Sequence, residues 1–168
     1  KVGDIFVCGA ESGRVRALID DNFTGMSQAF AANGYRNFGP LVGTGNVANL
    51  DYVTSMSNQS YLWSYGCGGG WWTNSNGIGS TEDLATRNLQ GVFTILFGSY
   101  FGDFDVQNNF MRAALAQGRM LTCMWAGFPN WYFHHMGLGE TIGHAAKLTM
   151  NNSGGHYFPV NHNTGSVR

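Results

Sequence analysis

The fold of this chain is decided by residues 60–70, SYLWSYGCGGG, and residues 91–98, GVFTILFG. Each is a short run rich in aromatic or β-branched residues, and such runs are typical of strands. Each also ends at glycine, which marks the turn after a strand. The second run is the most apolar of the chain, so we expect a strand that is buried on both faces, as in a parallel sheet.

Strand and helix patterns alternate on either side of these two runs. Further strands are predicted at residues 15–19, 38–42 and 120–126, and helices at residues 24–32, 81–88, 106–116 and 138–150, while residues 46–56 fit both patterns and favour a helix. This alternation predicts an α/β fold of three layers, α/β/α, around a mostly parallel, doubly wound sheet. No shift in composition marks a boundary, so residues 1–168 are expected to form one domain.

Several residues predict where these elements begin and end. Ser80 and Asp83 have the spacing of a capping box at a helix N-terminus. Asp105 is expected to cap the helix that carries Phe110, and Gly118 to end it. Residues 38–42 contain a proline, which suits a strand at the edge of the sheet.

Charged residues are scarce in this chain. Lys, Arg, Asp and Glu make up 11% of it, against about 25% in ordinary soluble domains. Its polar surface must come from Asn, Gly, Ser and Thr, which suits a secreted protein or a subunit covered by neighbours. Asn-X-Ser/Thr patterns at Asn22, Asn58 and Asn151 agree with an extracellular or cell-surface location.

Charge and hydropathy also exclude two classes of partner. The nine basic residues are scattered and the net charge is −1, so the chain lacks the basic surface that binds nucleic acid. Its longest apolar runs are far shorter than the ~20 residues that a membrane-spanning helix needs. We therefore expect neither a nucleic-acid partner nor a membrane span.

Cys67 is a candidate catalytic residue because it stands where a predicted strand ends, and ligands of parallel α/β sheets bind beyond such ends. The glycines that follow it could present backbone N–H groups to an oxyanion: Gly68, Gly69 and Gly70. A thiol beside such a nest becomes a nucleophile when a base lowers its pKa. The alternative is a glycine turn that folds Trp71 and Trp72 over the sheet edge, with Cys67 as a small filler.

Two further groups could complete such a site. Ser99 ends the next predicted strand, about 5 Å from Cys67 if the two strands are neighbours, and could serve Cys67 or replace it as nucleophile. His134 and His135 are the candidate bases in the second half of the chain. A hydrogen-bonded structural histidine and a serine turn that leads into a helix are the alternatives.

No cofactor is expected, with a divalent cation as the alternative. Adjacent carboxylates at Asp20 and Asp21 supply the oxygen ligands that such cations prefer, although an Asp after a strand also serves as a helix cap. His134, Glu140 and His144 are a second possible ligand set, but their spacing matches no standard zinc motif. The three cysteines match none either.

The order of these motifs resembles that of the gingipain-type cysteine peptidases, which share the caspase fold. In that family one strand ends in Gly-His-Gly, which carries the catalytic histidine, and the next buried strand ends in the catalytic cysteine. Here Tyr65-Gly66-Cys67-Gly68 is followed by a short helix near Ser80, a buried strand at residues 93–97, and Ser99-Tyr100-Phe101-Gly102-Asp103-Phe104. The resemblance covers residues 15–150.

The chain departs from the family at both catalytic positions. Cys67 stands at the position of the histidine, and Ser99 at that of the cysteine. A cysteine does not replace imidazole as a general base near neutral pH. The resemblance implies an exported or surface-displayed bacterial protein, and since the family's closing Gly-Asp-Pro strand is missing, a fragment of a longer one.

Two functions follow as expectations. The first is a non-catalytic relative that serves assembly or binding, with a protein partner or a second copy of itself against exposed aromatic or glycine-rich surfaces. The second is a thiol peptidase or hydrolase with a rearranged site, in which Cys67 attacks and His134 or His135 is the base. Whether the chain is an enzyme stays open at this point.

Overall fold

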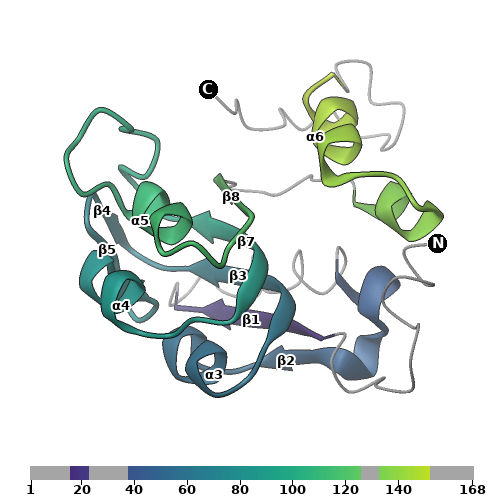
Figure 1. The fold of residues 1–168 in the computed structure, drawn as a ribbon, viewed down its shortest axis with the longest axis horizontal. Helices are drawn as coiled ribbons and strands as arrows, with labels where there is room; N and C mark the ends of the chain where they lie inside the picture. The colour runs from purple at the N-terminus through teal and green to yellow at the C-terminus, as the bar shows by residue number, and fades with distance from the viewer. Residues whose placement is uncertain (1–15, 23–37, 126–132, 152–168) are drawn as a thin grey trace.

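The computed structural model describes residues 16–22, 38–125 and 133–151 (Figure 1). Its centre is a five-stranded sheet in the order β2-β1-β3-β7-β8, in which every neighbouring pair is parallel. The strands are β1 (Ala17–Asp21), β2 (Val47–Asn49), β3 (Tyr61–Cys67), β7 (Gly91–Phe97) and β8 (Thr122–Trp125). The prediction of an α/β fold with a parallel sheet is confirmed.

The strand order reverses beside β1. The chain places β2 on one side of β1 and then returns to place β3 on the other, so β1 and β3 flank the point where the direction of winding changes. Asp21 pairs with Cys67, and Cys67 pairs with Phe97. The carboxyl ends of the three central strands are therefore level, and this is the edge where doubly wound proteins bind their ligands.

Helices cover both faces of the sheet. Leu18 and Leu96 point to one face, where they pack with α3 (Tyr52–Asn58), α4 (Thr81–Thr86) and α5 (Phe110–Ala116). Ile19 and Ile95 point to the other, toward residues 38–42, the 3-10 helix η2 (His134–Leu138) and α6 (Ile142–Met150). Adjacent residues of a strand face opposite sides, so each central strand contributes to two cores. The arrangement is compatible with three layers.

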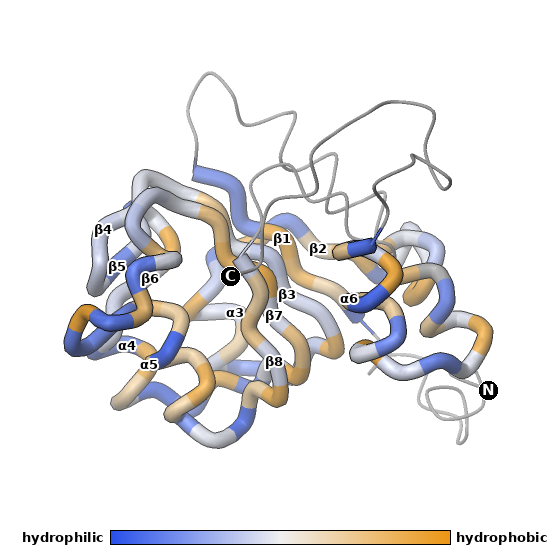
Figure 2. Tube along the Cα trace, turned by 90° about the horizontal axis from the view of Figure 1, so that it is seen from above, coloured by the Kyte–Doolittle hydropathy of each residue, from blue (hydrophilic) through white to orange (hydrophobic). Residues whose placement is uncertain are grey.

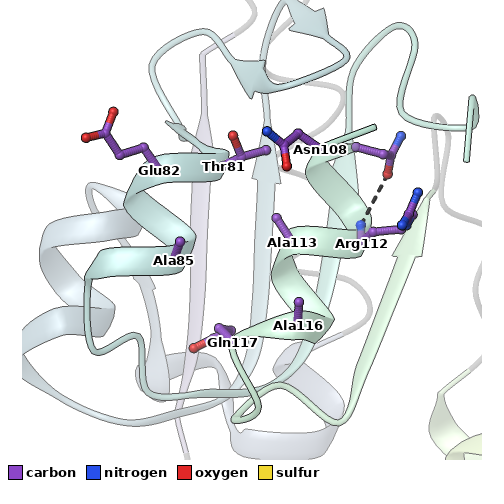
Figure 3. Close-up of a pocket in the computed structure, with 9 residues that line it drawn as sticks. Thr81, Glu82, Ala85, Asn108, Arg112, Ala113, Ala116 and Gln117 are labelled. Atoms are coloured by element: carbon purple, nitrogen blue, oxygen red, sulfur yellow. Dashed lines mark hydrogen bonds between the residues drawn. The ribbon is translucent and has the colours of Figure 1, made fainter. Parts of the chain in front are cut away.

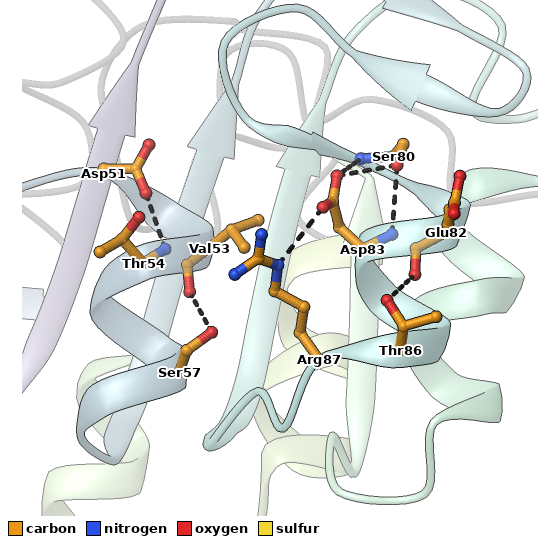
Figure 4. Close-up of polar contacts among 9 residues, drawn as sticks. All are labelled: Asp51, Val53, Thr54, Ser57, Ser80, Glu82, Asp83, Thr86 and Arg87. Carbon is orange, nitrogen blue, oxygen red and sulfur yellow. Dashed lines mark hydrogen bonds and ion pairs between the residues drawn. The ribbon is translucent and has the colours of Figure 1, made fainter.

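The helices on the first face begin at side-chain caps (Figure 4). Ser80 Oγ accepts from the backbone N–H of Asp83, and the Asp83 carboxylate accepts from the backbone N–H of Ser80, which forms the predicted capping box of α4. At α3 the Asp51 carboxylate accepts from the Thr54 N–H at 2.7 Å. These caps satisfy N–H groups that a helix leaves unpaired at its start.

A small antiparallel sheet follows the carboxyl end of β3. It consists of β4 (Gly70–Trp71), β5 (Asn74–Ser75) and β6 (Gly79–Ser80). Figures 1 and 2 both place β4 and β5 on the side of the molecule away from α6. The glycine run after Cys67 therefore leads into a hairpin that lies beyond the carboxyl edge of the parallel sheet.

Two predictions for the first half of the chain are wrong. Residues 38–42 are helical, because the four-residue spacing of Phe38 and Val42 puts both side chains into the core while Pro40 stays exposed. Residues 46–56 divide into the end of the 3-10 helix η1 (Thr44–Asn46), strand β2 and helix α3, because Asp51 starts a new helix. The predicted helix at residues 24–32 lies outside the described residues.

Three other elements form with shifted ends. α5 begins after Asn109 instead of Asp105, since the Asn109 side chain accepts from two N–H groups of the first turn, while Gly118 ends the helix with φ +82° as predicted. The predicted helix at 138–150 is η2 followed by α6, which starts after Thr141. β8 occupies Thr122–Trp125, within the predicted range.

Across the described ranges, the helices are too short and too polar to cross a bilayer.

Candidate functional site

The carboxyl edge of the sheet brings Asp21, Cys67 and the loop after β7 together. The Cys67 carbonyl accepts from the Asn22 N–H at 2.8 Å, and the Gly68 N–H donates to the Phe97 carbonyl at 3.1 Å. Both hydrogen bonds extend the strand ladders beyond β1, β3 and β7. The sequence left open whether the strands that end near Cys67 and Ser99 are neighbours; β3 and β7 do pair, and Cys67 lies inside the sheet with a strand on each side.

The Cys67 thiol has the surroundings of a protonated group. Its side chain is fully buried in the core that includes Tyr65 and Ile95. Burial raises its pKa most, and the hydrogen bond and negative charge of the Asp21 carboxylate raise it further. The pKa lies far above neutrality, so the thiolate that a nucleophile needs is disfavoured.

The glycines after Cys67 are explained by close packing. A Cβ on Gly68 would lie 2.2 Å from the Asn76 carbonyl oxygen, and one on Gly70 would lie 2.3 Å from that of Ser99. The Gly68 N–H already donates within the ladder, and the Gly69 carbonyl accepts from the Asn76 N–H at 2.8 Å. Ser99 is exposed and packs against Gly70, two residues beyond the end of β7. This arrangement does not favour an oxyanion nest next to Cys67.

The histidines lie on other elements. His135 is half-buried in η2, its ring centroid 5.6 Å from that of His144, whose Nδ1 is 3.8 Å from the Glu140 carboxylate. The side chain of His134 lies outside the described part of the chain. Figures 1 and 2 show α6 away from the β4–β5 hairpin, and no histidine is among the groups that shift the pKa of Cys67. Within the described residues, the group beside the thiol is therefore the Asp21 carboxylate and not an imidazole.

Asp20 is held by the protein in a structural position. Its carboxylate accepts from the backbone N–H of Tyr52 at 2.8 Å and from the Asn22 side chain at 2.7 Å. Burial raises the pKa of this carboxyl group. Among the residues that the structure describes, no three His, Cys, Asp or Glu side chains gather where they could hold a metal ion.

Aromatic side chains form the exposed part of this edge. Trp71, Trp72 and Tyr100 pack together, with ring centroids 4.2 Å apart for the two tryptophans and 5.0 Å for each tryptophan with Tyr100. We call these three residues the aromatic cluster. The Trp72 indole donates to the Asp103 carboxylate at 2.8 Å. The sequence pointed to the two tryptophans at the sheet edge but gave no sign that Tyr100 and Asp103 join them.

A groove of about 800 Å³ separates α4 from α5 (Figure 3). Its lining combines small residues with neutral and charged polar ones: Thr81, Glu82, Ala85, Asn108, Asn109, Arg112, Ala113, Ala116 and Gln117. Asn109 is engaged as the cap of α5, and the Arg112 guanidinium donates to the carbonyls of Phe104 and Val106. Asn109 and Arg112 therefore serve the start of α5 and the neighbouring loop.

Comparisons with known proteins do not assign a family. No family model matches the chain, and no solved structure matches it. A stretch of 29 residues, 17% of the chain, is 76% identical to part of translation initiation factor IF-2 from Sphingopyxis alaskensis. That stretch covers 3% of the factor, so the likeness is confined to a short segment of both proteins.

Proposed function

We propose that this chain is a non-catalytic binding domain with a gingipain-like, caspase-type fold, carried by an exported bacterial protein. The order of motifs and the five parallel strands support the fold assignment. The low share of charged residues supports export. Cys67 and Ser99 stand at the family's two catalytic positions, and these replacements support the proposal that the domain has lost catalysis.

One observation carries the proposal. At the carboxyl edge of the sheet, the thiol is buried beside a carboxylate, while the aromatic cluster is exposed, with Trp71 46% and Tyr100 47% accessible. Catalysis by thiol attack needs an accessible thiolate, and binding needs an accessible, ordered surface. At this edge the aromatic surface is accessible and the thiol is not.

The rival function is a thiol hydrolase with a rearranged site. It would need a histidine within hydrogen-bond reach of the Cys67 sulfur and a lowered thiol pKa. In the described part of the chain, the pKa of the Cys67 thiol is raised, and the group beside the thiol is the Asp21 carboxylate. The sequence alone predicts a protein partner or a second copy of the chain, and sedimentation of the purified chain tests self-association.

Alkylation of the native chain tests the loss of catalysis. Iodoacetamide is added near neutral pH, and the modified fraction of each cysteine is followed by mass spectrometry. We expect Cys67 to react no faster than the partly exposed Cys123, and both to react at similar, much higher rates in urea. Native labelling of Cys67 ahead of Cys123, slowed by His135→Ala, would instead establish the hydrolase.

A further inference from the structure

The aromatic cluster is held rigidly by its neighbours. A Cβ on Gly70 would lie 2.4 Å from the Ser99 nitrogen, so the backbones that carry Trp71 and Tyr100 touch. The Trp72 carbonyl accepts from the Phe110 N–H at 2.7 Å, which ties the hairpin to the start of α5. Tyr100 has φ +66°, a left-handed conformation that is costly for a bulky residue. Its ring is exposed all the same, so core packing does not account for the strain.

The polar groups beside the rings are acceptors. Asp103 uses one carboxylate oxygen, Oδ2, for the Trp72 indole. In the described part of the chain its other oxygen has no protein partner, and neither does the exposed carboxylate of Asp105. The nearby Arg112 donates to backbone carbonyls and forms no ion pair with either of them. The surface therefore combines flat apolar rings with unused acceptors and negative charge.

We infer that the aromatic cluster is a carbohydrate-binding site for a neutral sugar, which names the ligand of the binding domain proposed above and rests on that proposal. The C–H groups on one face of a pyranose ring would pack on the exposed ring of Trp71 or Tyr100. Its hydroxyl groups would donate to the Asp103 carboxylate. Aromatic side chains with a small number of fixed polar groups are the usual lining of small-ligand sites.

Size and shape favour a sugar over other ligands. Aromatic side chains offer roughly 150–250 Å² each, so Trp71 and Tyr100, which are 46% and 47% exposed, present about 200 Å², well below the ~800 Å² per partner of a stable protein interface. The rings contact one another, so no cage opens between them for an ammonium group. The carboxylates of Asp103 and Asp105 would repel acidic sugars and phosphates.

Affinity electrophoresis tests this site with defined probes. The purified chain is run in native gels that contain soluble xylan, galactomannan, mixed-linkage β-glucan or, as the acidic counterpart, polygalacturonate. We expect retardation by at least one neutral polysaccharide and none by polygalacturonate. Trp71→Ala should lower the association constant for the polysaccharide at least tenfold. Tyr100→Asn should do the same, and Asn is chosen because it tolerates the positive φ of this position. Asp103→Asn should lower the association constant severalfold.

Leu138→Ala is the control, because Leu138 is an apolar residue on η2 that is even more exposed than Trp71, at 76% against 46%, and lies outside the cluster. It should bind like the unchanged chain. Absence of retardation in all three neutral gels, or undiminished binding by Trp71→Ala, would overturn the site. Dimerisation that depends on Trp71, or binding of trimethylammonium in place of sugar, would also overturn it while leaving a binding function. Fast alkylation of Cys67 in the same preparation would instead reject the binding domain itself.

Discussion

The carboxylate of Asp20, at the end of β1, accepts a 2.8 Å hydrogen bond from the backbone N–H of Tyr52, the first residue of α3. The two residues are 32 positions apart, and the contact joins the central strand to the helix that covers it. A charged acceptor suits the positive end of a helix. Asp20 is only 9% exposed, so its carboxylate loses hydration on folding, and this loss raises its pKa.

Stability should depend on pH through Asp20. Burial raises its folded pKa above the usual 3.8, so the folded state holds the proton more tightly than the unfolded state. The contribution of Asp20 to the free energy of unfolding is therefore fully present below the unfolded pKa and is lost as pH rises through the folded pKa. Urea unfolding between about pH 3 and pH 7 measures it, as the difference between the unchanged chain and Asp20→Asn. That difference should shrink as pH rises.

Asp105→Asn provides the control for this titration, because Asp105 is exposed and its carboxylate forms no hydrogen bond or ion pair within the described residues. Its difference from the unchanged chain over the same range measures the effect of removing one surface charge. A constant difference for Asp20→Asn would show that Asp20 is solvated in the folded state.

Gly70→Ala should destabilise the fold. The new methyl group would meet the backbone of Ser99 at 2.3–2.4 Å, and backbone atoms cannot rotate away as a side chain can. We expect a loss of about 2 kcal/mol, in the range of overpacking substitutions. Gly102→Ala is the control, since a Cβ there meets no atom within 4 Å, and it should change stability by less than about 0.5 kcal/mol. Equal effects would contradict the close contact.

Ser80→Ala should cost about 1 kcal/mol, because it removes the acceptor for the Asp83 N–H at the start of α4. Thermal unfolding followed by circular dichroism measures the loss. Ser57→Ala is the matched control, since the Ser57 hydroxyl donates to the Val53 carbonyl within α3, where the helix already provides a partner. A Ser57→Ala effect as large as that of Ser80→Ala would argue against the capping box.

Thr94→Val should destabilise the centre of the sheet by about 1–3 kcal/mol. The Thr94 hydroxyl lies 2.6 Å from the Tyr52 hydroxyl and 2.9 Å from that of Ser64, and all three residues are fully buried. In the variant, the buried hydroxyl groups of Tyr52 and Ser64 lose the Thr94 hydroxyl as a hydrogen-bond partner. Adding Tyr52→Phe should then cost less than Tyr52→Phe does in the unchanged chain, which a double-mutant cycle measures. Strict additivity would show that the hydroxyl groups do not interact.

The strands and caps that the sequence predicted correctly share a local cause. Residues 60–65 and 91–97 carry aromatic or aliphatic side chains on both faces, with Ser64 and Thr94 buried among them, and a sheet buried on both faces accommodates such strands. The capping box of α4 needs two side chains three residues apart and nothing else. Residues 38–42 failed as a strand because their burial depends on packing, with Phe38 stacked 5.4 Å from Trp63 across the core.

At the candidate site too, local sequence predicted some features and tertiary packing decided others. The sequence placed Cys67 at a strand end, and it lies there, but whether a strand end is accessible depends on what packs over it. The neighbouring strands and the raised pKa of the thiol come from contacts with Asp21 and with the core. Neither contact has a signature in the residues around Cys67.

The sequence by itself determined the α/β class, the parallel strands and the position of the glycine turn after β3, because these follow from local apolar pattern and backbone freedom. Only the tertiary structure decided which side chains meet at the carboxyl edge. Trp72 and Asp103 are 31 residues apart, and their contact depends on the pairing of β3 with β7. Burial likewise turned Cys67 from a candidate nucleophile into a core residue, because desolvation is set by the neighbours that fold over a group.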